Sequence, residues 1–196
     1  MKNIIIILNN IRSNENVGAI FRTADAAGVS KIILCGYTPA PVDRFGRENK
    51  GLIKASLGAE KNIEWEKAEN FKEVIKKLKN YSSGHSQKCT DIFLLKNSSC
   101  SAQSASQGIS DNTHSNNFLA FKIVAIEQSE KAIDYRKIKK IKAKNVALVF
   151  GNEVEGLSKK DLELCDYIAE LPMLGKKESL NVSVCTGIVL YSLIAD

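Results

Sequence analysis

Short apolar runs alternate with amphipathic segments along this chain of 196 residues, and this alternation constrains its fold more than any other feature. Short apolar runs are typical of buried strands, and apolar residues spaced three and four apart are typical of helices packed on a sheet. Strands that alternate with helices predict an α/β fold with a mainly parallel sheet flanked by helices. The expected strands are 4–8, 31–35, 121–126, 146–150 and 167–171, and the expected helices are 17–27, 49–57, 65–79, 158–164 and 180–194.

One segment breaks this pattern. Residues 82–117 hold ten serines, with Asn, Gln and Gly between them, and we interpret the segment as a flexible insertion in a single domain of residues 1–196. Both histidines, His85 and His114, lie in it. A flexible loop is a poor place to hold a catalytic imidazole, so we expect neither histidine catalysis nor a histidine metal site. The five cysteines form no CxxC pair, which favours buried, reduced thiols over a metal site.

The charge distribution favours a polyanionic partner. The formal net charge is +6, and two groups of basic residues stand out. Either group alone is more simply a solvated surface, but together they make nucleic acid the leading candidate partner. No apolar run is long enough to span a bilayer, and the N-terminal apolar stretch reads as a strand rather than a signal peptide, so we expect a cytoplasmic protein. The two groups are Arg44, Arg47, Lys50 and Lys54, and Lys131, Arg136, Lys137, Lys139, Lys140, Lys142 and Lys144.

A glycine loop follows the expected strand 146–150. Its two glycines, Gly151 and Gly156, are spaced as in a phosphate-binding loop, but Leu157 stands where that loop needs its lysine. Glu153 and Glu155 lie where anionic phosphates would bind. The loop therefore suits a ligand that is not strongly anionic, and a plain tight turn is the alternative that explains the two acids less well.

A polar stretch at residues 10–24 joins the first expected strand to a helix. Asn14 and Asn16 are natural caps for the start of the helix, and Gly18 permits close backbone approach. We expect the cap, Gly18 and Arg22 to face one side. The alternative is a capped helix with a surface arginine paired to Asp25.

A second polar stretch, residues 171–183, leaves the last expected strand and enters the last helix. Ser179 is the expected N-cap of that helix. Asn181 and Ser183 lie among apolar residues, so they need polar partners if they are buried. The alternative is a capped core helix with a satisfied asparagine.

Residues 10–24, 149–158 and 171–183, in this order, resemble the signature motifs of the SpoU-type (TrmH-like) RNA 2′-O-ribose methyltransferases of the SPOUT superfamily. The bridging segments 55–60 and 124–129 are also similar, and the resemblance covers about residues 3–194 apart from the insertion. It implies a SPOUT fold with a deep trefoil knot in the C-terminal part, and a homodimer. Because the first motif starts within a dozen residues, we expect no separate RNA-binding domain ahead of it.

The resemblance further implies that S-adenosylmethionine binds in the knot. This sulfonium cofactor needs no lysine of the phosphate-binding kind. The implied cofactor-binding residues are Glu127, Gly151, Leu171, Met173, Ser179 and Leu180.

The implied reaction is methyl transfer to a ribose 2′-hydroxyl of tRNA or rRNA. Arg22 is the implied catalytic residue. Because a guanidinium stays protonated at ordinary pH, its expected role is to hold the adjacent phosphate, and either that phosphate or a transiently deprotonated Arg22 takes the proton. Asn16, Glu153, Ser179 and Asn181 are expected to orient Arg22 and the ribose. The alternatives are a non-catalytic RNA-binding relative, and a nucleotide-dependent switch that Leu157 disfavours.

Overall fold

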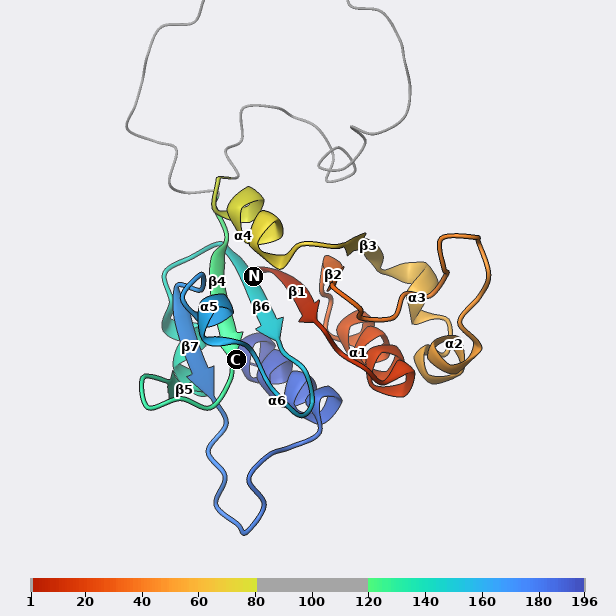
Figure 1. The fold of residues 1–196 in the computed structure, drawn as a ribbon. Coiled ribbons are helices and arrows are strands. Elements are labelled where there is room, and N and C mark those ends of the chain that lie inside the picture. The colour runs from red at the N-terminus through yellow and green to blue at the C-terminus, as the bar shows by residue number, and fades with distance from the viewer. Residues whose placement is uncertain (1, 81–119, 196) are drawn as a thin grey trace, which may run out of the picture.

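The computed structural model describes residues 2–80 and 120–195, and these form a sheet covered by helices (Figure 1). The sheet has seven strands in the order β3-β2-β1-β6-β4-β7-β5, and every neighbouring pair is parallel. The predicted α/β class with a parallel sheet is therefore confirmed. The strands are β1 (Asn3–Asn9), β2 (Lys31–Cys35), β3 (Glu64–Ala68), β4 (Lys122–Ile126), β5 (Ile133–Asp134), β6 (Asn145–Phe150) and β7 (Tyr167–Glu170).

The central strands are buried on both faces, which explains their uninterrupted apolar sequences. Ile4, Ile6 and Leu8 of β1 join one buried cluster, and Ile5 and Ile7 join the other. Helices α1, α2 and α6 belong to the first face, and α4 belongs to the second. The helices are α1 (Asn14–Ala26), α2 (Lys50–Ser56), α3 (Ala59–Asn62), α4 (Phe71–Lys79), the 3-10 helix η3 (Tyr135–Lys140), α5 (Lys159–Leu162) and α6 (Val182–Ile194).

The helix predicted at 65–79 is wrong in its first part. Residues 64–68 form β3, which pairs with β2 at the edge of the sheet. The helix starts only at Phe71, because the Asn70 side chain accepts a hydrogen bond from the Glu73 amide and so caps it. The short elements α3, β5 and η3 were not predicted, because elements of two to six residues show too little periodicity in the sequence.

Two helix starts differ from the prediction by a few residues. Helix α1 starts at Asn14 and is capped by Ser13, whose hydroxyl accepts a hydrogen bond from the Asn16 amide at 3.0 Å. Helix α6 starts at Val182 and is capped by Asn181. Ser179, the predicted cap, therefore lies in the loop before α6.

Several predictions fall on residues outside the described ones. They are the insertion at 82–117, both histidines, and Cys89 and Cys100. The three described cysteines are free thiols, and burial raises the pKa of Cys35, Cys165 and Cys185 to about 12. Within residues 2–80 and 120–195, no helix is long and apolar enough to cross a bilayer.

Candidate functional site

A cavity of about 500 Å³ lies where β4, β6 and β7 end. Its floor is formed by residues that directly follow these strands, including Glu127, Gly151 and Leu171. Its other walls come from the loop between β7 and α6 and from the first residues of α6. Parallel sheets commonly bind ligands outside the carboxyl ends of their strands, so the topology alone makes this cavity the leading candidate site.

Nine of the ten predicted site residues line this one cavity. They come from segments far apart in the sequence, which the parallel strands bring to one edge of the sheet. The nine are Asn16, Glu127, Gly151, Glu153, Leu171, Met173, Ser179, Leu180 and Asn181.

Sequence reasoning missed other lining residues. Gln128 and Glu170 stand next to the ends of expected strands, and Asn152 lies inside the glycine loop, so their position was a usable signal. Glu178 and Cys185 carry no such signal, because their approach to the cavity depends on the path of the loop between β7 and α6.

A chain of hydrogen bonds joins the three motifs at the cavity wall. The Asn181 amide nitrogen donates to Asn16 Oδ1 at 3.0 Å, and the Asn16 amide nitrogen donates to Glu153 Oε1 at 3.1 Å. Glu153 also accepts the backbone N–H groups of Arg12 and Ser13, at 3.0 and 3.2 Å. Glu153 therefore fixes the start of α1 and, through Asn16, the start of α6.

The hydrogen bonds to Glu153 decide its protonation state. Partial burial works to raise the pKa of this carboxyl group, but the hydrogen bonds from Arg12, Asn16 and Ser13 outweigh it and hold the pKa below its usual value. Glu153 is therefore a structural carboxylate at neutral pH, and three protein donors occupy most of its acceptor sites.

Asn152 organises the glycine loop. Its side-chain oxygen accepts the backbone N–H groups of Val154 and Glu155, and its amide nitrogen donates to the Asn10 carbonyl and to the Tyr37 hydroxyl. The loop is thus bonded to the ends of β1 and β2. The two glycines therefore flank an ordered turn that is hydrogen-bonded to residues that follow the neighbouring strands.

Both glycines of this loop are required by contacts within the protein. A Cβ at Gly151 would lie 2.7 Å from the Gly156 carbonyl carbon and from the Leu157 nitrogen. A Cβ at Gly156, whose φ is +66°, would lie 2.4 Å from Glu127 Oε2. Gly151 is an implied cofactor-binding residue and lines the cavity, but its Cβ position faces the loop itself.

Replacing Gly156 with alanine is expected to lower the free energy of unfolding by about 1–3 kcal/mol, because the left-handed backbone and the contact with Glu127 both oppose a side chain. Gly175→Ala is the matched control, since its Cβ would meet nothing within 4 Å and should cost less than about 1 kcal/mol. Urea denaturation measures both. Equal losses for the two variants would contradict this interpretation of Gly156.

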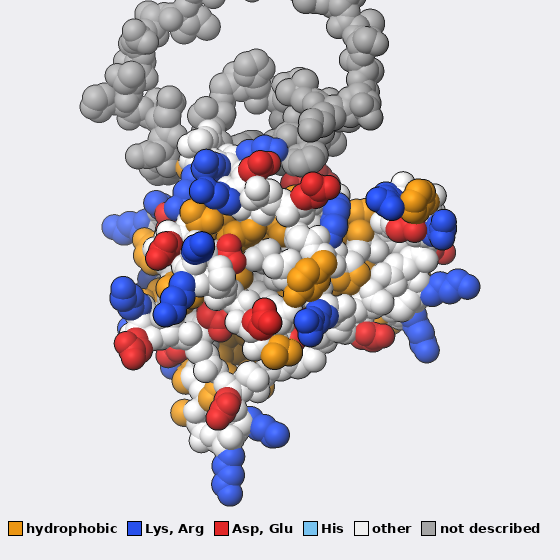
Figure 2. Space-filling model, in the orientation of Figure 1, with side chains coloured by type: hydrophobic (Ala, Val, Ile, Leu, Met, Phe, Trp, Pro, Cys, Tyr) orange, Lys and Arg blue, Asp and Glu red, His pale blue; other side chains and the backbone are white. Residues whose placement is uncertain are grey.

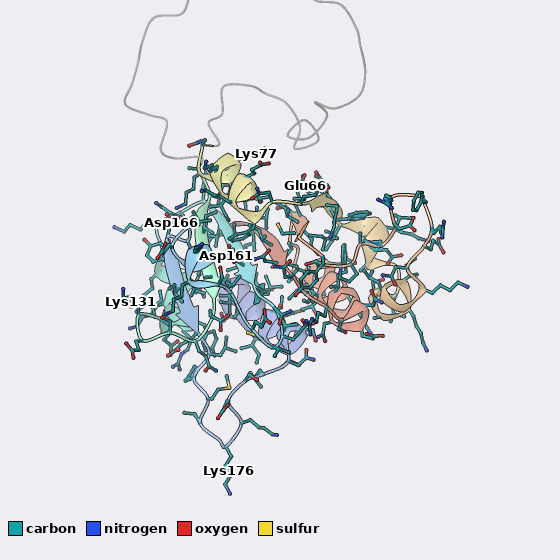
Figure 3. All side chains as sticks on the ribbon, viewed as in Figure 1. Glu66, Lys77, Lys131, Asp161, Asp166 and Lys176 are labelled. Carbon is teal, nitrogen blue, oxygen red and sulfur yellow. The ribbon has the colours of Figure 1, made fainter. Side chains whose placement is uncertain are left out.

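Glu127 and Gln128 connect β4 to the two loops of the cavity. Glu127 Oε2 accepts the Leu157 N–H at 2.9 Å, which holds the glycine loop. The Gln128 side-chain amide donates to the Glu178 carbonyl at 2.5 Å, which holds the loop before α6. That loop projects from the body of the protein, and Lys176 at its tip points away from the fold (Figures 2 and 3).

The charged side chains that line the cavity are all acidic. No lysine or arginine stands among the described lining residues. Such a lining disfavours a nucleoside triphosphate and favours a cationic or neutral ligand. The apolar walls, which include Phe150, Leu171 and Val182, suit an aromatic ring. The acidic residues are Glu127, Glu153, Glu170 and Glu178.

Arg22 is the predicted site residue that does not line the cavity of the single chain. Its side chain is exposed on α1, and no hydrogen bond or ion pair joins it to another described residue. The alternative pairing with Asp25 is also not found, because Asp25 accepts a hydrogen bond from Asn62 instead. Arg22 is therefore free to meet a group from outside this chain.

The prediction that the cap, Gly18 and Arg22 share one side is wrong for the cap residue Asn16. Asn16 lines the cavity, whereas a Cβ at Gly18 would lie 2.4 Å from the Leu52 carbonyl of α2. At 3.6 residues per turn, Asn16 and Arg22 point about 120° apart around the helix. Gly18 thus permits the close packing of α1 on α2.

Comparisons with known proteins agree with this arrangement. A family model described as the SpoU rRNA Methylase family matches residues 3–99 and 98–191. The chain is 27% identical over 191 residues to a 23S rRNA (guanosine-2′-O-)-methyltransferase, RlmB, of Bordetella pertussis, which covers 97% of this chain and 59% of that protein. It is 27% identical over 190 residues to a tRNA (guanosine(18)-2′-O)-methyltransferase of Aquifex aeolicus, covering 97% of this chain and 68% of that one.

A solved structure has the same fold. The crystal structure of an AdoMet-bound rRNA methyltransferase from Sinorhizobium meliloti matches with a TM-score of 0.70 and 26% identity, over 97% of this chain and 55% of that chain. This chain spans less than two thirds of the length of its first curated relatives, at 63% and 59%. The family model covers most of the chain with its three motifs at one cavity, and the chain therefore belongs to the SpoU rRNA methylase family.

Proposed function

We propose that this protein transfers a methyl group from S-adenosylmethionine to a ribose 2′-hydroxyl of tRNA or rRNA. The observation that carries the proposal is the acidic cavity at the ends of β4, β6 and β7, which has no cation among its described lining residues. A sulfonium ligand matches that charge, and the family to which the chain belongs supports the same chemistry. The relatives named above act on rRNA or on tRNA, so both remain candidate substrates.

The cavity fits the cofactor in size and chemistry. Drug-sized and cofactor-sized ligands occupy cavities of about 300–1,000 Å³, and this one falls in that range. Leu171, Met173 and Leu180 would enclose the adenine, and the glutamates would favour the positive sulfur. When bound, S-adenosylmethionine supplies an activated methyl group. We also propose that the segment from β6 to α6 forms the trefoil knot of SPOUT proteins, in a single catalytic domain that works in the cytoplasm.

The residues of this chain would contribute mainly alignment. Asn16 and Asn181 are locked to one another, so they can hold a ribose at a fixed place beside the cavity. Ser179 lines the same wall and caps no helix, which leaves its hydroxyl available to RNA. Holding the two reactants at a productive angle is a large part of what a protein can add to such a displacement. Arg22 would bind the phosphate next to the reacting ribose, and that phosphate or Arg22 would take the proton.

We further propose a homodimer, in which Arg22 of one copy reaches the cavity of the other. Helix α6 is apolar on all sides, and Val184, Ile188 and Tyr191 leave an exposed stripe at helical spacing. This stripe lies beside α1, since a Cβ at Gly187 would lie 3.5 Å from Thr23, the neighbour of Arg22. A second copy that covers the stripe would therefore also meet Arg22.

Replacing Ile188 with glutamate is expected to convert the dimer to a monomer, because it places a charge in the middle of the apolar stripe. Sedimentation velocity measures the change, and Leu57→Glu is the control, because Leu57 is 67% exposed and lies at the C-cap of α2, outside the stripe. A wild-type protein that is monomeric at micromolar concentration would refute the dimer.

The proposed reaction is tested with tritiated S-adenosylmethionine and RNA from cells that lack the gene. Label is expected in tRNA or rRNA, and nuclease digestion followed by mass spectrometry should find it as a 2′-O-methylnucleoside. Label that appears only on a base would overturn the proposed acceptor. Cofactor binding without any transfer to total RNA would support a non-catalytic RNA-binding protein instead.

A further inference from the structure

We propose that the turn around Phe45, between β2 and α2, is a stacking site for an unpaired base of single-stranded RNA. Phe45 is 64% exposed, and its ring is flanked by two guanidinium groups. The Cζ atoms of Arg44 and Arg47 lie 4.8 and 5.1 Å from the centre of the ring. The cavity and its wall do not use any of these three residues.

The turn is held in a fixed shape by hydrogen bonds to the side chain and the carbonyl of Asp43. Asp43 Oδ1 accepts the N–H groups of Phe45 and Arg47, at 2.7 and 2.9 Å, and the Asp43 carbonyl accepts the Gly46 N–H at 3.0 Å. Gly46 has a φ of +77°, which closes the turn. The ring is therefore presented to solvent at the tip of an ordered turn, so binding a base there would cost little ordering entropy.

The charge around the turn favours a polyanion. Lys50 and Lys54 of α2 follow Arg44 and Arg47, and all four side chains are exposed. Basic and hydrophobic side chains lie together over the β2–α2 connection, at the right-hand end of the molecule in Figure 2. Two acids lie in the same segment: Asp43 is hydrogen-bonded within the turn and lies 4.0 Å from Arg47, and Glu48 is exposed, so the cations outnumber the acids by four to two. An exposed aromatic ring among cations is the combination that binds single strands, by stacking on bases and by pairing with phosphates.

The interaction energies allow a base to displace an arginine from the Phe45 ring. An exposed cation–π contact is worth about 0.5–1 kcal/mol, whereas stacking of a base on an aromatic side chain is worth about 1–3 kcal/mol. The displaced guanidinium of Arg44 or Arg47 could then pair with the neighbouring phosphate. Because stacking needs an unpaired base, the site should discriminate single strands from duplexes.

The turn is connected to the proposed catalytic site through α1. The Asn49 side-chain amide, at the cap of α2, donates to Asn14 Oδ1 at 2.7 Å, and Asn14 is two residues from the cavity residue Asn16. A strand held at Phe45 would thus be held by an element that is bonded to the catalytic helix. This inference rests on the proposed function only for the role of the bound RNA, since the binding itself needs no methyl donor.

The test uses the full chain without cofactor and a fluorescein-labelled RNA of mixed sequence, on the order of a dozen nucleotides, as a single strand and as a duplex. Phe45→Ala is expected to weaken single-strand binding about tenfold and duplex binding less than about twofold, as loss of one stacked base predicts. Phe45→Trp should retain the affinity. Leu57→Ala is the matched control, with an exposed apolar side chain at the C-cap of the adjacent helix α2.

A second pair of variants separates charge from stacking. The double variant Arg44→Gln/Arg47→Gln should lower the affinity for both RNAs, and binding should release about one to two fewer counterions, which reduces its salt dependence. The control Lys72→Gln/Lys76→Gln on α4 should change neither quantity. An unchanged affinity in Phe45→Ala, an equal loss for both RNAs, or a loss in Phe45→Trp would each overturn the inference. If methyl transfer proceeds while Phe45→Ala leaves the affinity for RNA unchanged, this inference fails and the proposed function stands. If S-adenosylmethionine does not bind but Phe45→Ala still weakens single-strand RNA binding, the proposed function fails and this inference stands.

Discussion

Replacing Arg22 with alanine is expected to lower the rate of methyl transfer by about a hundred- to a thousandfold, the usual effect of removing one preorganised donor at a reacting centre. The affinity for S-adenosylmethionine should change less than about twofold, because the proposed partner of Arg22 is the phosphate of the RNA and not the cofactor. Single-turnover transfer of tritiated methyl to RNA measures the rate, and calorimetric titration measures the affinity. A near wild-type rate would remove Arg22 from the mechanism.

Arg22→Lys and a mixed dimer sharpen this prediction. Lysine keeps the charge but loses the planar fork that binds a phosphate with two hydrogen bonds, so an intermediate rate is expected. Mixing Arg22→Ala with Asn181→Ala subunits should restore part of the activity if Arg22 serves the partner's cavity. No restoration, with mixed dimers verified by mass, would place the function of Arg22 within one chain.

Replacing Glu153 with alanine is expected to lower both the stability of the protein and its rate of methyl transfer. It leaves the N–H groups of Arg12 and Ser13 and the Asn16 side chain without their acceptor, so the free energy of unfolding should fall by about 1–3 kcal/mol. Transfer should also fall, because Asn16 then loses one of its two side-chain partners. Urea denaturation measures the stability, and Glu155→Ala, in the same loop and exposed, is the control.

The contribution of Glu153 should depend on pH in one direction. Because the folded state holds its pKa below the usual value, its stabilising effect is fully present above the unfolded pKa of about 4.3 and is lost as the pH falls through the folded pKa. The stability difference between wild type and Glu153→Gln should therefore be constant near neutral pH and shrink in acid. A difference that grows in acid would contradict the assigned hydrogen bonds.

The sequence predicted the central sheet well because parallel strands that are buried on both faces must be apolar throughout. The runs at Ile4–Leu8 and Val146–Phe150 leave few other structures open. The edge strand β3 was missed because its alternating sequence at 64–68 merges with the apolar spacing of α4. Tertiary pairing with β2, rather than local preference, decides that these residues are a strand.

The site residues were predictable as a set, but their individual contacts were not. Strand ends and glycine loops are visible in the sequence, whereas the partner of a close backbone approach is not. Gly18 was expected to permit close backbone approach and Gly151 to bind the cofactor, yet their Cβ positions face α2 and the glycine loop's own backbone. The outward direction of Arg22 also depends on where α1 begins, which the cap at Ser13 fixes only in the folded chain.

The most direct test is calorimetric titration of S-adenosylmethionine and of S-adenosylhomocysteine, which lacks the positive sulfonium. Wild type should bind both at one site per chain. Glu178→Lys, which puts a cation on the cavity rim, should weaken S-adenosylmethionine severalfold more than the neutral thioether, whereas Glu163→Lys, exposed and away from the cavity, should change neither. Absence of heat from S-adenosylmethionine with folded wild-type protein would contradict the assignment of this cavity to a methyl donor.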